Sequence, residues 1–428
     1  MKTHTLSFIS FFSTIHSKRN PHALKFLLFI FLPSLLCSQT GAWTQKSTFP
    51  GGPRGYGVAG VVNGKAYCGL GYDGFNNKND WYMYDPVLDT WTPKAAFPGS
   101  GVIGGVALSI GNKIYVGSGD SAWSAMNKQF WMYNPQNDTW TQRADFAGRT
   151  RYAAGGFAVN GKGYIATGWD FNGQYCDRDL WEYDTLSNSW AQKLSIPGGA
   201  GAPRLGAYGI SSPNSVFLAF GEDSIHQWLT DLVQYLPASN SWRHRAALPS
   251  TPRFCSVGFF TGGKLYAGLG QDATIAVHHD FWAYDTLSNS WTQVASYPGG
   301  GGGVCIAFII NGFGYVYGGV DYGNLHYYDD MWMFDPSATG VLENGNPPDF
   351  SIFPCPFKNT FTICPGNSRN LTGIALYDVQ GKAMEITTAL SANGEWIVST
   401  SGIQDGMYIL HIETKQGVYI RKIIKQQS

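Results

Sequence analysis

The sequence predicts an all-β protein in which a six-bladed β-propeller is followed by a small C-terminal β-sandwich. A segment of alternating aromatic residues, a polar turn and a tryptophan recurs along the chain at intervals of 48 to 52 residues. The 428-residue chain contains 54 glycines and 15% aromatic but only 14% charged residues, which suits many short, tightly turned strands. No amphipathic helix of useful length interrupts the repeats, so antiparallel sheets are the expected building block.

The clearest repeat is DLWEYDTLSNSW at Asp179–Trp190, which returns almost unchanged as DFWAYDTLSNSW at Asp280–Trp291. Alternating aromatic residues, a turn rich in Asp, Asn and Ser, and a following Trp predict a strand, a tight turn and a second strand. In five copies an aromatic residue precedes this Trp by seven positions: Tyr84/Trp91, Tyr133/Trp140, Tyr183/Trp190, Tyr235/Trp242 and Tyr284/Trp291. These segments are the expected third and fourth strands of each unit.

Two further strands lie upstream of each copy, as an apolar stretch, a turn such as VNGK or IGNK, and an aromatic residue. The aromatic residues are Tyr67, Tyr115, Tyr164, Phe217, Tyr266 and Tyr315. A glycine follows each by four positions: Gly71, Gly119, Gly168, Gly221, Gly270 and Gly319. Four-stranded antiparallel units with a period of about 50 residues are typical of a β-propeller.

The two ends of the array predict how the ring closes. The sixth unit has its third strand at Trp332–Phe334, but Val341 occupies the position where a fourth-strand Trp is expected. Trp43, at the other end of the repeats, has no partner strand before it. We therefore expect Trp43–Thr48 to form the outer strand of the last blade, which leaves no open sheet edge between the ends of the array.

The N-terminus has the features of a secretory signal peptide over residues 1–38. A basic stretch ending at Lys25 precedes an apolar run from Phe26 to Leu36, and small or polar residues follow. The run is too short to span a bilayer, so no transmembrane anchor is expected after cleavage. A lipoprotein anchor at Cys37 is the alternative, although Leu36 is bulky where that signal requires a small residue.

The repeat carries the order Arg, apolar strand, N-G-K-x-Y, a glycine pair, Y-D-P and Trp, and in this it resembles the kelch repeat. The resemblance covers roughly residues 41–340 and implies a kelch propeller of the galactose oxidase/kelch superfamily. The glycine doublet is intact only at Gly318-Gly319, and the fourth unit has Val233 in place of Trp and Leu236 in place of Asp.

The chain loses the repeat after a Pro/Gly/Asn-rich linker at 341–349, and residues 350–428 alternate in the manner of a small β-sandwich. Its distinctive segments are Phe353-Pro354 with Pro356-Phe357, Leu376–Asp378 with Gly381-Lys382, Gly406–Leu410, and Arg421–Lys425. These segments resemble the type A C-terminal sorting domain of the type IX secretion system, although that family has Asn where this chain has Cys355. The resemblance implies export by the type IX machinery to the exterior or outer surface of a Gram-negative bacterium. The tail is then removed or serves as an anchor.

Charge and cysteine spacing narrow the functional classes. The 29 basic and 29 acidic residues balance, so there is no electrostatic basis for binding nucleic acid or an acidic membrane. Four cysteines lie within the repeats without CxxC or metal-site spacing, and we expect them to be buried apolar residues: Cys68, Cys176, Cys255 and Cys305. Cys355 and Cys364 lie close together in an exported chain and are candidates for a disulfide.

The lengths of the connections between strands indicate which face of the propeller binds a ligand. In a blade of antiparallel strands, the 2–3 and 4–1 connections share one face and the 1–2 and 3–4 turns share the other. The 1–2 and 3–4 turns are short and uniform, whereas the 2–3 connections are long and varied. Variation on a rigid scaffold is typical of recognition sites, so we expect the functional site on the 2–3/4–1 face.

Two sets of charged residues are candidates on this face. An Arg lies thirteen positions before the second-strand aromatic residue in four units, as Arg54, Arg151, Arg204 and Arg253; Val102 and Gly302 replace it in the other two. An Asp follows the second-strand glycine in every unit: Asp73, Asp120, Asp170, Asp223, Asp272 and Asp321. One interpretation is that each Arg pairs with a nearby Asp and that the Asp caps its turn. The other is that the arginines of units three to five line one side of the channel mouth and hold an anionic sugar.

Aromatic and histidine side chains in the same loops are further candidate ligand contacts. The aromatic residues are Tyr72, Phe75, Trp123, Trp169, Phe171, Trp228 and Tyr322. The histidines are His226, His278, His279 and His326. Flat aromatic rings at a rim either stack on sugar rings or fold back over neighbouring loops, and the sequence leaves both interpretations open.

The residues favour neither a metal nor another cofactor. A copper oxidase of the galactose oxidase kind also uses a kelch propeller, but it needs a Cys crosslinked to a Tyr. The adjacent loop residues Tyr175 and Cys176 cannot form that crosslink. No loop has calcium-binding EF-hand spacing, and no hydrolase, zinc-protease or phosphate-loop motif stands out.

Two functional hypotheses follow from these patterns. The first is a non-enzymatic binding protein, secreted or at the cell surface, that recognises glycans or proteins with the 2–3/4–1 face. The second is an enzyme resembling the six-bladed kelch mutarotases that act on sialic acid. In that enzyme the arginines would hold the carboxylate of a sugar acid while an Asp or His moves a proton. A deep pocket at the axial mouth favours the enzyme, and a shallow surface favours the binding protein.

Overall fold

The computed structural model describes residues 40–99, 102–121, 127–170, 175–198, 203–339, 350–354, 357–365, 371–378, 382–391, 394–414 and 417–426. The expected signal peptide, the expected linker at 341–349, and the candidates Trp123 and Phe171 lie outside these residues. In the described part of the chain, six four-stranded antiparallel sheets form the propeller and two more form the C-terminal sandwich. The all-β prediction is thus confirmed, with one short 3₁₀ turn, η1 (Pro237–Ser239).

The first three blades each follow the chain from the innermost to the outermost strand. The first consists of β2 (Val58–Val62), β3 (Lys65–Gly69), β4 (Trp81–Asp85) and β5 (Thr90–Pro93). The second consists of β6 (Val106–Ile110), β7 (Lys113–Gly117), β8 (Phe130–Asn134) and β9 (Thr139–Gln142). The third consists of β10 (Gly155–Val159), β11 (Lys162–Ala166), β14 (Leu180–Asp184) and β15 (Ser189–Lys193).

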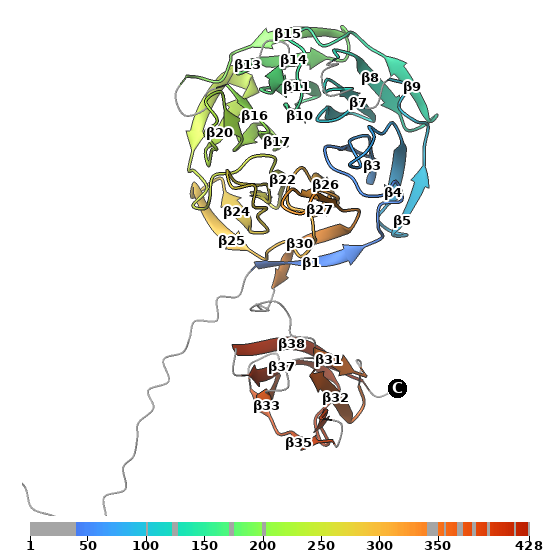
Figure 1. Ribbon diagram of the computed structural model, residues 1–428, viewed down its shortest axis with the longest axis vertical. Helices are drawn as coiled ribbons and strands as arrows, with labels where there is room; N and C mark the ends of the chain where they lie inside the picture. Colours follow the sequence, from blue (N-terminus) through green and yellow to red (C-terminus); the bar gives the residue numbers. More distant parts are fainter. Residues whose placement is uncertain are drawn as a thin grey trace, which may run out of the picture. The chain divides into compact units, whose positions relative to one another are not determined.

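The next two blades repeat this order. The fourth blade consists of β17 (Tyr208–Ser211), β18 (Val216–Ala219), β20 (Leu232–Leu236) and β21 (Ser241–Arg245). The fifth consists of β22 (Val257–Thr261), β23 (Lys264–Gly268), β24 (Phe281–Asp285) and β25 (Ser290–Val294). The blades surround a central axis, with the first strand of each toward the middle and the fourth at the rim (Figure 1).

The sixth blade joins the two ends of the repeat array, as the sequence predicts. It consists of β26 (Ile306–Ile310), β27 (Phe313–Tyr317), β30 (Met331–Thr339) and the N-terminal strand β1 (Thr40–Lys46). Strand β1 pairs antiparallel with β30, and Trp43 lies opposite Phe334 in the register. The N-terminal strand therefore supplies the fourth strand that the sixth repeat lacks and closes the ring.

A circle of backbone hydrogen bonds around the axis connects each blade to its neighbour. The six participants lie two positions after the arginine position, and each has a φ between 49° and 65°, in the left-handed region. Each N–H donates to the equivalent carbonyl of the preceding blade at 2.8–3.3 Å. The donor and acceptor pairs are Tyr56 to Val304, Gly104 to Tyr56, Ala153 to Gly104, Gly206 to Ala153, Cys255 to Gly206, and Val304 to Cys255.

The glycine at the end of every second strand makes a second circle. Its N–H donates to the carbonyl at the arginine position of the next blade at 2.6–3.1 Å: Gly71 to Val102, Gly119 to Arg151, Gly168 to Arg204, Gly221 to Arg253, Gly270 to Gly302 and Gly319 to Arg54. The φ of these glycines lies between 82° and 111°, where a side chain is strained. This geometry explains why glycine recurs at the position without exception.

The fourth-strand tryptophans hold the blades together at the rim. Each indole N–H donates to a backbone carbonyl of the preceding blade at 2.8–3.1 Å: Trp43 to Ala295, Trp91 to Ser47, Trp140 to Ala95, Trp190 to Ala144, Trp242 to Leu194 and Trp291 to Ala246. In five blades the residue whose carbonyl accepts the indole N–H also donates its own backbone N–H. The acceptor is the side-chain oxygen of an Asp or Asn two positions before the Trp: Asp89, Asp138, Asn188, Asn240 and Asn289. The repeated turn-and-Trp segment is therefore a two-point clamp between blades.

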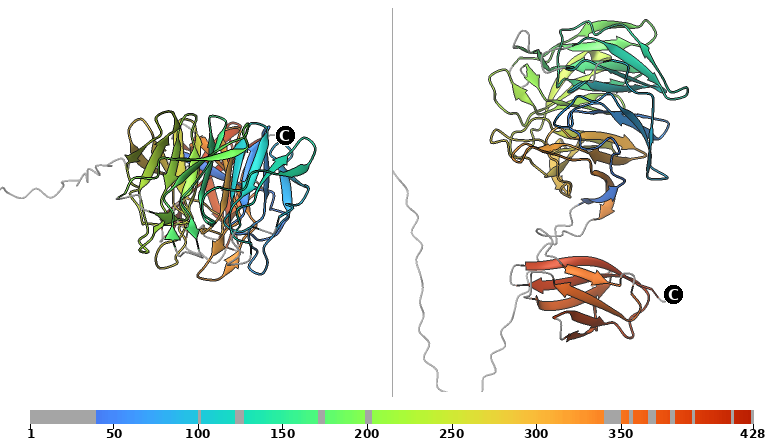
Figure 2. Two further views of the ribbon diagram at one scale, coloured as in Figure 1. Left: turned by 90° about the horizontal axis from the view of Figure 1, so that it is seen from above. Right: turned by 45° about the vertical axis from the view of Figure 1, so that its right-hand side comes forward.

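The C-terminal sandwich has its own hydrophobic core, which includes Phe361, Leu376 and Leu410. One sheet has the order β31 (Phe350–Phe353), β32 (Thr360–Pro365), β36 (Trp396–Ser399) and β35 (Thr387–Leu390). The other has the order β34 (Ala383–Met384), β33 (Leu371–Asp378), β37 (Gly406–Thr414) and β38 (Gly417–Lys425). Both sheets are visible in the right-hand view of Figure 2.

We expect Gly221→Ala to lower the free energy of unfolding of the propeller by about 2–4 kcal/mol. Gly221 has a φ of 111°, and a Cβ there would lie 2.8 Å from the carbonyl oxygen of Leu205. Urea unfolding followed by tryptophan fluorescence measures the loss.

Gly161→Ala is the matched control, because Gly161 has a φ of 74° but a Cβ there meets no atom within 4 Å. It carries the conformational cost without the clash, so we expect a loss of about 1 kcal/mol. Equal losses of unfolding free energy in the two variants would contradict the steric explanation for the glycine that recurs at this position in all six repeats.

Candidate binding face

Most of the described 2–3 connections are small hairpins rather than irregular loops. Two contain two-residue strand pairs: β12 (Trp169–Asp170) with β13 (Tyr175–Cys176), and β28 (Val320–Asp321) with β29 (His326–Tyr327). In the fourth blade, β19 (Glu222–Asp223) of the 2–3 connection pairs with β16 (Arg204–Leu205) of the preceding 4–1 connection. Bridges from Tyr72 to Asn77, Glu222 to Trp228 and Gln271 to Val277 close the connections of the first, fourth and fifth blades. The binding face expected from the sequence is thus built from short, hydrogen-bonded hairpins.

Aspartates from the predicted set cap these hairpins. The Oδ1 atom of Asp73, Asp223, Asp272 and Asp321 accepts the backbone N–H two positions later, at 2.8–2.9 Å. In the first and fourth blades it accepts a further backbone N–H, from Asn76 and Gln227. This is the turn-capping role that one interpretation of the sequence assigned to them. Asp120 and Asp170 are buried.

The tips of four hairpins expose apolar side chains. Phe75 is 86%, Ile225 70%, Ile275 52% and Leu325 76% exposed. They belong to the first, fourth, fifth and sixth blades, which are consecutive around the closed ring. The aspartates therefore hold a row of apolar tips on one side of the 2–3/4–1 face. Of these four residues only Phe75 is aromatic and was a candidate from the sequence; the aliphatic side chains Ile225, Ile275 and Leu325 carry no comparable signal.

The candidate aromatic residues pack mainly against neighbouring hairpins. Trp228 meets Phe254 of the fifth blade edge-to-face, with ring centroids 4.4 Å apart. Tyr72 contacts Tyr327 of the sixth blade at 5.9 Å, and the Trp169 backbone forms a bridge to Tyr152. The hydroxyl groups of Tyr56 and Tyr322 lie 2.5 Å apart. The contacts of Trp228, Tyr72 and Tyr322 join a hairpin to an adjacent blade, whereas the Trp169 bridge lies within the third blade.

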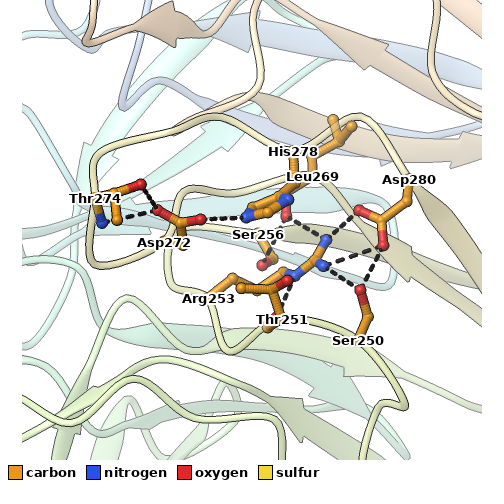
Figure 3. Close-up of polar contacts among 9 residues, drawn as sticks. All are labelled: Ser250, Thr251, Arg253, Ser256, Leu269, Asp272, Thr274, His278 and Asp280. Atoms are coloured by element: carbon orange, nitrogen blue, oxygen red, sulfur yellow. Dashed lines mark hydrogen bonds and ion pairs between the residues drawn. The ribbon is translucent and has the colours of Figure 1, made fainter.

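Two of the four candidate histidines, His226 and His278, hydrogen-bond to carboxylates of their own hairpins. The rings of His279 and His326 contact Tyr297 and Tyr328. Nε2 of His278 lies 3.0 Å from Oδ2 of Asp272, and Thr274 donates to the other carboxylate oxygen (Figure 3). Nδ1 of His226 lies 2.5 Å from Oε1 of Glu222, and the His226 side chain is largely exposed. The hydroxyl and backbone of Thr274, then His278, lower the pKa of Asp272.

The four arginines lie inside the blades, and none of their side chains is exposed. Each forms a two-pronged ion pair with the Asp just before the third strand: Arg54 with Asp80, Arg151 with Asp179, Arg204 with Asp231, and Arg253 with Asp280. Each also donates to the carbonyl of a residue sixteen positions later. Figure 3 shows this network around Arg253, where Ser250 and Thr251 supply further acceptors.

This placement corrects the expectation that the arginines hold an anionic sugar at the channel mouth, because none of the four guanidinium groups is exposed. The other interpretation had each Arg pair with a nearby Asp. Such pairs form, but with the Asp before the third strand of the blade rather than with the Asp that follows the glycine. The sequence does contain a pattern that could have identified these partners. In each of the six blades an acidic or amide residue directly precedes the third strand: Asp80, Gln129, Asp179, Asp231, Asp280 and Asp330. Gln129 replaces Asp in the blade where Val102 replaces Arg.

The axial channel is narrow and lined by small residues. Its cavity is about 100 Å³ and is bordered by Gly57, Ala107, Gly156 and other first-strand residues. Tyr208 spans it and donates its hydroxyl to the carbonyl of Ala307 at 3.1 Å. Such a volume accommodates a few water molecules rather than a sugar ring.

The described cysteines are unbridged. Cys68, Cys176 and Cys305 are buried as expected, whereas Cys255, also expected to be buried, is only partly so because it lies in a connection rather than in a strand. Burial raises the pKa of Cys176 to about 12. Cys355 lies outside the described residues, so its pairing with Cys364 stays a prediction. No cluster of three His, Cys, Asp or Glu side chains suited to a metal occurs in the part of the chain that the structure describes.

Comparison with known proteins identifies the tail and the propeller fold. Residues 351–426 match the family of secretion system C-terminal sorting domains. The solved structure of YjhT, a kelch-type β-propeller, superposes with a TM-score of 0.59 at 17% sequence identity. It covers 67% of this chain and 95% of YjhT, and shows the fold alone. A search of curated proteins gave no significant match.

The match to the sorting domain establishes the destination of the protein. The tail is a type IX sorting domain, so the chain is recognised by the type IX secretion machinery and is secreted or displayed on the outer surface. No helix among the described residues is both long and apolar enough to cross a membrane.

We expect Asp280→Asn to change how stability depends on pH. Burial opposes ionisation of Asp280, but the hydrogen bonds and charge of Arg253 lower its pKa to about 2. Because this lies below the unfolded-state pKa of about 3.9, the stabilisation is complete above about pH 4 and is lost as pH falls toward 2. We expect the free energy of unfolding of the wild type to exceed that of the variant by a few kcal/mol at pH 7, and the difference to shrink as the pH falls. Urea unfolding at a series of pH values measures this difference. A difference that does not change with pH would contradict the stabilising role given to the Arg253–Asp280 ion pair.

We expect Asp330→Asn to be neutral or stabilising by up to about 2 kcal/mol. The sixth blade has Gly302 in place of the arginine, and Oδ1 of Asp330 is buried without a hydrogen-bond partner among the described residues. Asp231→Asn is the contrast, since it leaves buried Arg204 without its carboxylate and costs about 3–5 kcal/mol. Differential scanning calorimetry compares the stability of the two variants with that of the wild type. A similar loss of stability in both would show that Asp330, like Asp231, has a partner.

Proposed function

We propose that this exported propeller is a binding protein that attaches a partner to its 2–3/4–1 face outside the cell. The division of labour follows the domains: residues 1–38 direct the chain to the export pathway, residues 41–340 recognise the ligand, and residues 350–428 are the sorting tail. The observation that carries the proposal is the row of exposed apolar tips at Phe75, Ile225, Ile275 and Leu325.

The construction of the hairpins supports this role. A single exposed apolar residue on a protein surface needs no explanation, whereas four in equivalent positions on consecutive blades form a pattern. The capping aspartates restrain the hairpins before any ligand arrives, which lowers the entropy lost on binding. Burying one such side chain against a partner contributes about 1.5–3 kcal/mol. Aliphatic tips favour a protein ligand over a glycan at this part of the face.

The geometry gives less support to the alternative, a sugar-acid mutarotase or epimerase. That enzyme requires arginines at the mouth of the channel and a pocket deep enough for a sugar ring. The structure has buried arginines and a channel cavity of about 100 Å³. A narrow axial channel beside exposed apolar tips favours the binding protein.

We expect the double variant Phe75→Ser/Leu325→Ser to lose its partner while keeping its fold. Mature full-length protein would be immobilised and exposed to the extracellular and outer-membrane proteins of the same cells, and the retained proteins identified by mass spectrometry. Affinity for the retained partner, measured by surface plasmon resonance, should fall at least tenfold, because two apolar contacts are removed.

Leu186→Ser/Leu287→Ser is the matched control. These leucines are 94% and 95% exposed on the 3–4 turns, at the opposite face of the propeller. The control should bind as the wild type does, and both double variants should keep the wild-type melting temperature. Loss of binding in the control but not in the tip variant would assign recognition to the other face.

A further inference from the structure

A cavity of about 430 Å³ opens on the 2–3/4–1 face between the second and third blades. Its volume lies within the range of small-molecule binding sites. The side chains that matter most here are Lys128, Arg149, Arg178, Trp181, Gln192 and Ser195. None of them was a candidate ligand contact from the sequence: Trp181 belongs to the repeated third-strand pattern, and the other five lie outside the positions that recur.

The base of the cavity is electrically balanced. Arg151 pairs with Asp179 and also lies 3.3 Å from Oδ2 of Asp177. Nη1 of Arg149 lies 3.8 Å from Oδ1 of the same Asp177. Two arginines thus offset two aspartates. Burial raises the pKa of Asp177, although Arg151 and Arg149 oppose the shift.

Two further cations at the rim leave the cavity basic. Lys128 and the exposed Arg178 form no ion pair with any carboxylate in the residues that the structure describes. By contrast, Lys78 of the first blade is already held by Asp73. The 2–3 connections of the fourth, fifth and sixth blades contain no Lys or Arg at all. A basic site therefore stands out on a face whose other hairpins are mainly acidic.

The wall of the cavity combines ring surface with uncharged polar groups. The indole N–H of Trp181 donates to Asp179 at 2.7 Å, so this residue contributes mainly ring surface to a ligand. Gln192 and Ser195 add an amide and a hydroxyl. Gly148 packs closely against the rings of this wall, since a Cβ there would lie 2.5 Å from the ring of Phe146 and 2.8 Å from Nε1 of Trp181. An aromatic ring beside amide and hydroxyl groups suits a sugar ring.

We propose that this cavity binds an acidic saccharide, with its carboxylate or sulfate at Arg178 and Lys128 and its ring against Trp181. Arg178 provides planar, paired donors for the anionic group, and Lys128 adds a second positive charge. The proposal rests on the proposed function only in taking the protein to be an extracellular binding protein. It uses none of the apolar tip residues.

The test is a glycan array in which each acidic sugar is printed beside its neutral parent. D-glucuronate is paired with D-glucose, D-galacturonate and 6-sulfogalactose with D-galactose, so that the carboxylate and sulfate arms are read separately. We expect mature full-length protein to bind at least one acidic sugar at least tenfold more tightly than its parent. Isothermal titration calorimetry with that sugar should show affinity falling as salt rises.

Substitution at the rim then locates the site. Arg178→Gln and Lys128→Gln should each weaken binding of the selected sugar at least tenfold. Lys162→Gln is the matched control, because it removes the same charge from the 1–2 turn of the third blade, on the opposite face, where Lys162 pairs with Asp184 at 2.7 Å. It should bind as the wild type does, and all three variants should keep the wild-type melting temperature.

Three outcomes would overturn the proposal: no acidic sugar bound, neutral parents bound equally well, or unchanged affinity in both rim variants. None of these outcomes would contradict the proposed function, because that is tested separately, by the binding of a protein partner to the tip variant. Conversely, loss of partner binding in the Phe75/Leu325 variant leaves binding of the acidic sugar unaffected if the two sites are separate.

Discussion

The closed circle of six backbone hydrogen bonds around the axis is the interaction on which the rest of the structure depends. Each of its residues, from Tyr56 to Val304, both donates to one neighbouring blade and accepts from the other. The circle is closed by the bond from Tyr56 of the first blade to Val304 of the sixth, the blade that β1 completes. Left-handed φ values at all six positions turn the chain into each first strand at the same place. The 2–3 hairpins start from this common base, so their positions are set by the ring.

The ring also explains why the four repeated arginines are buried rather than exposed on the binding face. Arg54, Arg151, Arg204 and Arg253 lie where two blades converge, and there each guanidinium is surrounded by a carboxylate and backbone carbonyls. A buried cation needs such partners because removing it from water is costly. Repeated residues of this kind serve the contacts that every blade shares. What differs between blades is instead exposed, as the apolar tips on one part of the face and the Lys128/Arg178 rim on another, and it is to these features that we assign recognition in our proposals.

Much of the fold was predictable from the sequence because its signals are local and repeated. The Tyr-to-Trp spacing, the NGK turns and the glycine after each second strand indicated six four-stranded units. The orphan Trp43 indicated the closure that pairs β1 with β30. The candidate site was less predictable. The spacing of the arginines and aspartates placed them near the 2–3/4–1 face. It could not show whether the Arg54 side chain, for example, turns inward to Asp80 or outward to a ligand.

By itself, the sequence determined the all-β class, the number of blades, the closure by Trp43 and the sorting tail, because each depends on periodic or short-range patterns. Only the tertiary structure decided which carboxylate each arginine meets, which loop residues are exposed, and where a cavity opens. Partners such as Arg253 and Asp280 are 27 positions apart and meet only after the strands between them have paired. The cavity draws Lys128 and Arg178 from different blades, so it exists only after the blades have packed together.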